Sequence, residues 1–147
     1  MKRIRFRAAS GRGRRRGAAA VEFAMIAPLF LLLLAGIIEF GQAFRIQHSL
    51  SHAARRGARA ATMEGTTAAE VAERITSYCE RILGVDPAAV TVVVAVNGQP
   101  AASLDNAEPG DEISVTARVP YSEAGVGFFA HMFVNTTLSA TCTLERE

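Results

Sequence analysis

The chain has 147 residues, and about a hundred remain for one small domain once a tail and a membrane segment are set aside. Its formal net charge of +2 combines two unlike parts: residues 1–17 contain eight basic residues and no acid, whereas residues 18–147 contain eight bases and fourteen acids, a net of −6. Because the excess positive charge belongs to the tail alone, the sequence argues against a domain that binds nucleic acid.

The first seventeen residues, MKRIRFRAASGRGRRRG, have too few large apolar side chains to form a core. Lys and Arg next to a membrane segment stay on the cytoplasmic side. We therefore expect residues 1–17 to be a basic cytoplasmic leader, with the chain beyond the membrane segment outside the cytoplasm. An RNA-binding arm is the alternative, and the apolar run that begins a few residues after the last arginine disfavours it.

A long apolar segment follows the tail. Phe23 to Ile38 are sixteen residues without a charge or a strongly polar side chain. At about 1.5 Å per residue a helix of this length covers most of a ~30 Å hydrocarbon core, and the apolar flanks complete the span. Pro28 predicts a bend, and Glu39 is expected to reach water at the outer end.

The helix is expected to continue beyond the membrane. The Ala-rich stretch from Arg45 to Thr62 contains no proline, so the sequence predicts a transmembrane helix with an outward helical extension over residues 18–62. The Ala-rich face of the extension could lie against a neighbouring helix.

Three fates of the apolar segment are open. It could be a secretory signal cut before Phe44, an uncut anchor, or a helix cut after Gly17. The third accounts for Glu22, whose ionised carboxylate costs up to about 3 kcal/mol at the mouth of the span unless it is paired. A cut after Gly17 would give Ala18 an amine, with a pKa of about 8, one helical turn from Glu22.

Residues 63–147 predict an outer α+β domain, with one or more helices packed on an antiparallel sheet of about four strands. Thr67 and Glu70 form a capping box for an amphipathic helix over residues 68–83. Asn97-Gly98 is a strong signal for a two-residue hairpin turn. The expected strands are residues 89–96, 99–104, 112–119 and 135–144.

Two features of this domain have alternative interpretations. The apolar segment over residues 124–134 is either a turn of helix that covers the core or an exposed patch for another subunit or the membrane face. Cys79 and Cys142 are expected in a compartment where a disulfide can form, but two cysteines 63 positions apart are weak evidence for a bond, and the alternative is two small buried apolar side chains.

The sequence contains none of the motifs that an enzyme of a common class would need. It has no GxSxG, no Walker loop and no CxxC. His48 and His52 have the spacing of a metal pair without a third ligand, and the acidic loop over residues 105–111 lacks the alternating frame of a calcium loop. We therefore expect no enzymatic activity, no metal and no cofactor.

The string RRRGAAAVEFAMIAPLFLLLLAGIIEFG resembles the N-terminal helix of TadE-like proteins of the tight-adherence (Flp) pilus system. Within it, Gly17 to Phe23 is similar to the prepilin-peptidase site of type IV pilin-like proteins. The resemblance implies a pseudopilin or minor pilin of the bacterial inner membrane, cut between Gly17 and Ala18. It also implies that Glu22 sets the helix register and Phe23 aids recognition, with the peptidase, other pilin-like subunits and the membrane assembly platform as partners.

Overall fold

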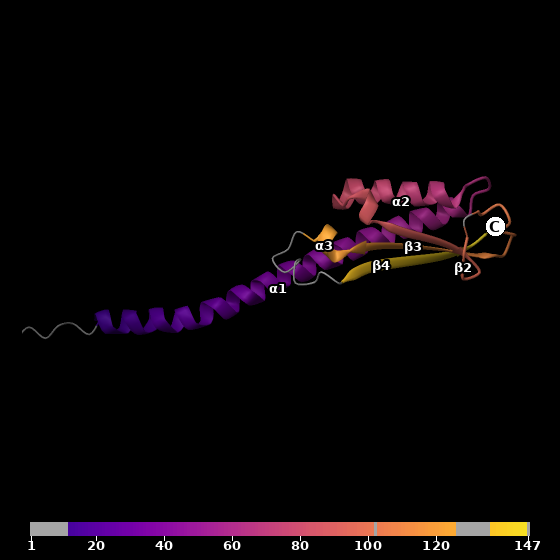
Figure 1. Cartoon of the computed structure of the whole chain (residues 1–147). Coiled ribbons are helices and arrows are strands. Elements are labelled where there is room, and N and C mark those ends of the chain that lie inside the picture. Colours follow the sequence, from indigo (N-terminus) through magenta and orange to yellow (C-terminus); the bar gives the residue numbers. More distant parts are fainter. Residues whose placement is uncertain (1–11, 102, 126–135, 147) are drawn as a thin grey trace, which may run out of the picture. The chain divides into compact units, whose positions relative to one another are not determined.

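The computed structural model describes residues 12–101, 103–125 and 136–146, and the side chains from residue 17 onward. The chain divides into two compact units, Met1–Ile37 and Ile38–Glu147. The first consists of the start of α1, and the second contains every other element (Figure 1). In chain order the elements are α1 (Arg12–Ala61), α2 (Ala68–Leu83), η1 (Pro87–Ala89), β1 (Thr91–Val96), β2 (Gln99–Pro100), β3 (Glu112–Pro120), α3 (Tyr121–Ala124) and β4 (Thr137–Glu145).

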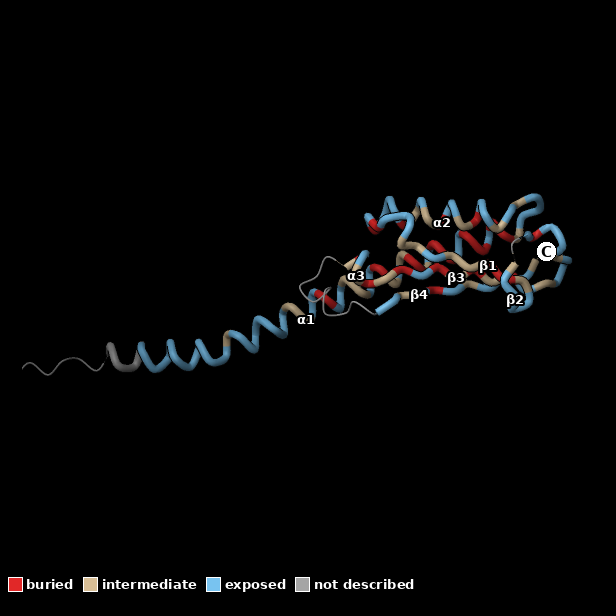
Figure 2. The backbone as a smooth tube through the Cα atoms, viewed as in Figure 1, coloured by how far each residue is buried: buried red, intermediate tan, exposed pale blue. Residues whose placement is uncertain are grey.

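In the first unit α1 exposes large apolar side chains all around its axis. It continues through Pro28, and Phe23 and Met25 are 71% and 76% exposed. Figure 2 shows this part of the tube as almost wholly exposed. Among the described residues this is the one helix long and apolar enough to cross a membrane, and none of its most apolar stretch is buried. The predicted long N-terminal apolar helix is therefore confirmed as a candidate membrane span.

The second unit draws much of its core from the rest of α1. The buried face of this part carries Ile46 and Leu50, and then the small residues Ala54, Gly57 and Ala58. A Cβ atom on Gly57 would lie 2.5 Å from Cδ1 of Ile75 on α2 and 3.2 Å from Cγ1 of Val115 on β3. The helix that meets the Ala-rich face is thus α2 of the same chain, and the sheet lies against it as well.

The sheet has the order β2-β1-β3-β4 with every pair antiparallel. Its core face carries buried residues of β3 at alternate positions, because side chains along a strand point to opposite faces. The other face is rich in hydroxyl groups, and Thr116 and Thr141 hydrogen-bond across it at 2.8 Å. The core residues of β3 are Ile113, Val115, Ala117 and Val119.

The local signals at the ends of the predicted elements are mostly present. Thr67 and Glu70 form both bonds of the capping box, and Gly84 ends α2 in the left-handed conformation. Asn97 and Gly98 both have positive φ, 52° and 79°, as a two-residue type I′ hairpin requires. These features confirm the predicted α+β fold with a four-stranded antiparallel sheet.

Two predicted strands are shorter than expected. The strand over residues 89–96 begins at Thr91, because Asp86 and Pro87 start a 3₁₀ turn instead. The return strand over residues 99–104 is reduced to Gln99–Pro100, since proline cannot donate to the ladder. The apolar segment over residues 124–134 lies almost wholly outside the described residues.

Candidate functional site

The residues of the predicted processing site lie near the start of α1. Because the helix begins at Arg12, the bond between Gly17 and Ala18 is inside helical structure. Both residues are exposed, and among the described residues no atom other than those of the adjoining helix backbone lies within 4 Å of the position where Gly17 would carry a Cβ. Among the described side chains none covers this bond, which lies within the hydrogen-bonded first turns of the helix.

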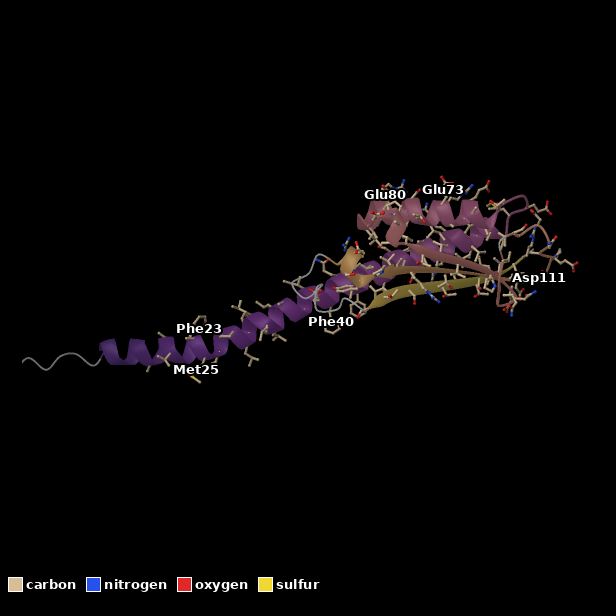
Figure 3. All side chains as sticks on the ribbon, in the orientation of Figure 1. Phe23, Met25, Phe40, Glu73, Glu80 and Asp111 are labelled. Carbon is tan, nitrogen blue, oxygen red and sulfur yellow. The ribbon has the colours of Figure 1, made fainter. Side chains whose placement is uncertain are left out.

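Glu22 and Phe23 are likewise exposed on α1, and Figure 3 shows the Phe23 ring standing away from the ribbon. Residues four apart lie on the same face of a helix, about 6 Å apart along its axis. Ala18 and Glu22 have this spacing within continuous helix. The helical geometry thus agrees with the expected proximity of a new Ala18 amine to the Glu22 carboxylate.

A second acidic residue of α1 has a very different environment. Glu39 is only 7% exposed, and its Oε1 accepts a hydrogen bond from the hydroxyl of Tyr121 at 2.6 Å. Tyr121 is 3% exposed and follows β3 directly, as the first residue of α3. This contact ties α1 to the end of the sheet within the second unit.

Burial of Tyr121, together with its bond to Glu39 and the negative charge of that carboxylate, raises the pKa of the tyrosine to about 12. The phenol therefore stays protonated near neutral pH and serves as a donor. The expectation that Glu39 reaches water is wrong, because Tyr121 covers it. No sequence pattern links two residues that are 82 positions apart.

The predicted disulfide is not formed in the structure, which has both cysteines as free thiols. Cys79 is fully buried on the core face of α2, and burial raises the pKa of its thiol. Cys142 is half-buried on β4, opposite Val115 of β3. A bond between the two cysteines remains a prediction for an oxidising compartment.

The side chains considered as metal ligands have other roles in the structure. His48 and His52 are exposed, with their Nε2 atoms 3.0 Å apart. Asp111 accepts hydrogen bonds from Nδ2 of Asn97 and the backbone N–H of Glu108, and these bonds lower its pKa. Within the described part of the chain no three potential metal ligands gather.

Comparison with known proteins identifies the segment that carries the predicted site. Residues 17–59 match the family of TadE-like proteins. This stretch contains Gly17, Glu22 and Phe23, and also Glu39 and the small-residue face around Gly57. No curated protein and no solved structure shows significant similarity to the chain. The resemblance seen in the sequence is thereby confirmed over residues 17–59, the segment that matches the family of TadE-like proteins.

Proposed function

We propose that the protein is a pseudopilin or minor pilin that assists assembly of a Flp/Tad-type pilus and is cut by a prepilin peptidase between Gly17 and Ala18. The observation that carries this proposal is the match to TadE-like proteins on a helix whose apolar side chains are exposed. Such a helix is unstable in water and needs a lipid bilayer or neighbouring apolar helices around it.

The proposed organisation follows from the charge of the tail. Residues 1–17 are a cytoplasmic leader, residues 18–62 are the membrane helix and its outward extension, and residues 63–147 complete a periplasmic or extracellular α+β domain. The protein lies in the bacterial inner membrane. Its partners are the prepilin peptidase, other pilin-like subunits, the membrane assembly platform and the bilayer, and it acts as a substrate of the peptidase without enzymatic activity of its own.

Cleavage would change the charge balance at the inner end of the helix. It removes eight basic residues and leaves an amine on Ala18, one turn from Glu22. That amine, in the same subunit or in a neighbour, neutralises the Glu22 carboxylate. An unpaired Glu22 carboxylate destabilises a single helix in lipid. When the amine of a neighbouring subunit pairs with it, the same carboxylate stabilises two packed helices at one fixed position along their axes.

The burial of Glu39 disfavours the first alternative, a secreted domain released before Phe44. Such a cut falls inside the second unit and removes Glu39 from its bond to Tyr121. It would also remove Ala43, which packs against the core. The second alternative, an uncut scaffold or adaptor of the secretion platform, keeps this contact and differs only in its N-terminus.

A substitution at Glu22 tests the role in assembly. We expect Glu22→Ala to insert in the membrane normally but to reduce surface pili strongly, because the helix loses the charge that sets its register. Pili sheared from the cells are compared with the amount of protein in the membrane fraction. Glu64→Ala, which removes an exposed carboxylate in the turn after α1, is the matched control. Normal pili with Glu22→Ala would exclude the register role.

A further inference from the structure

An open groove lies between α1 and α2 in the second unit. It encloses about 600 Å³ and has four arginine side chains among its lining residues. Arg56 and Arg59 come from α1, and Arg74 and Arg81 come from α2. We call this feature the arginine groove, and all four arginines that define it are exposed.

The arginine groove is strongly basic in an acidic part of the chain. Residues 18–147 contain eight arginines and have a net charge of −6, yet four of the eight line this groove beside one carboxylate, Glu73. Within the ranges that the structure describes, these four guanidinium groups form no ion pair. Arg56 lies over the ring of Tyr78, 5.5 Å from its centroid. Arginine beside tyrosine in a concave site is typical of residues that dominate binding at protein interfaces.

A complementary surface lies at one end of the sheet, where Figure 3 places Asp111. The side chain of Asn97 holds two acidic residues of this surface in place. It donates a hydrogen bond to Asp111 at 2.8 Å and accepts one from the backbone N–H of Glu112 at 3.0 Å, which connects the hairpin turn to the loop before β3. Among the described residues the basic side chain at this surface is that of Arg146, which donates to the carbonyl of Leu104. We call this surface the acidic end, formed by Asp105, Glu108, Asp111, Glu112 and Glu145.

Two of these carboxylates are placed unfavourably within a single chain. The register of β3 and β4 sets Glu112 directly opposite Glu145, and both side chains are exposed. Like charges at opposed positions of an antiparallel pair destabilise the sheet. A cationic group from another molecule would remove this repulsion, and arginine is suited to the task because its guanidinium can bond two carboxylate oxygens at once.

We propose that the acidic end of one copy of the protein docks into the arginine groove of a second copy. The two surfaces differ, so the contact is heterologous, and each docked copy leaves its own groove open for the next. Arg56 is eighteen residues beyond Ile38, about 27 Å along the helix, so with the proposed membrane span the arginines are beyond the reach of lipid headgroups. This association requires neither cleavage after Gly17 nor a pilus.

A charge exchange between two tagged full-length proteins in detergent tests the contact. In the groove variant Arg59 and Arg74 become Glu, and in the end variant Glu108 and Glu112 become Lys. We expect wild-type copies to co-purify at low salt and separate at high salt. Each variant alone should lose self-association at least about tenfold. A mixture of the two variants should recover it, because each then offers the charge that the other lacks.

The matched control reverses two arginines outside the groove, Arg55 and Arg118, both exposed. It changes the net charge by the same amount as the groove variant and should associate like the wild type. Failure of the mixture to recover association, or equal loss in the control, would overturn the proposal.

A second measurement needs no charge reversal. Met63 lines the groove and is 63% exposed, so a photoactivatable cross-linking residue can replace it with little effect on the core. Cross-linked dimers should join residue 63 of one copy to the peptide that contains Glu108 and Glu112 of the other. Cross-links to another protein, to another part of the partner copy, or only within one chain would refute the docking.

Discussion

At the scale of single residues, the two acidic side chains of α1 have opposite environments. Glu22 is exposed on an apolar helix, whereas Glu39 is buried and bonded to Tyr121. The sequence allowed a role for Glu22 to be predicted, because the sequence alone shows an acidic residue at the start of an apolar segment. It could not reveal the partner of Glu39, because that contact exists only after β3 has returned the chain to α1.

Replacement of Tyr121 by Phe measures the contact with Glu39. The change leaves the ring in place and removes the hydroxyl, so the buried carboxylate loses a hydrogen-bond donor. We expect the free energy of unfolding of the full chain in detergent to fall by about 1–3 kcal/mol, as measured with denaturant. Tyr78→Phe is the control, because Tyr78 makes no hydrogen bond through its hydroxyl within the described residues. Equal effects in the two variants would contradict a specific role for the Glu39 contact.

The two cysteines should differ in reactivity. In the folded, reduced protein we expect a maleimide to modify Cys142 on the order of tenfold faster than Cys79, because Cys79 is buried and its thiol has a raised pKa. Denatured protein should react equally at both positions. Protein taken from cells and denatured without reductant should show no free thiol if the predicted disulfide forms, and two free thiols would exclude it.

At the scale of elements, periodicity and end signals were sufficient to locate most helices and strands. The capping box at Thr67 and the turn at Asn97 are local, so the sequence alone could specify them. What α1 packs against could not be predicted in this way. A glycine inside a helix is destabilising in general, but in the structure Gly57 lets α1 approach α2 and β3 closely.

Gly57→Val tests this close approach. The added side chain would collide with Ile75 and Val115, both fully buried, so we expect a loss of about 1–3 kcal/mol in the free energy of unfolding. Gly41→Val in the same helix is the control, since among the described residues no atom other than those of the adjoining helix backbone lies within 4 Å of its Cβ position. If the two variants unfold at the same denaturant concentration, the close packing of α1 at Gly57 is not important for stability.

At the scale of the whole molecule, the chain joins an exposed apolar helix to a folded α+β unit through the continuous helix α1. The TadE-like match covers both parts of that helix and ends just before α1 does. The sheet and α2 lie outside the match, whereas the arginine groove joins Arg56 and Arg59 inside it to Arg74 and Arg81 outside it. The apolar run of the sequence predicted the membrane anchor and the basic tail predicted its orientation, but this groove could not be predicted, because it brings together residues of two helices.

The first residue of the mature protein is the most direct test of the account. Protein extracted from the membrane fraction of its own cells is subjected to amino-terminal sequencing. We expect Ala18 as the first residue, in a membrane-bound protein that keeps α1 and the contact between Glu39 and Tyr121. A water-soluble protein that begins at Phe44, or a membrane protein that retains residues 1–17, would contradict processing after Gly17.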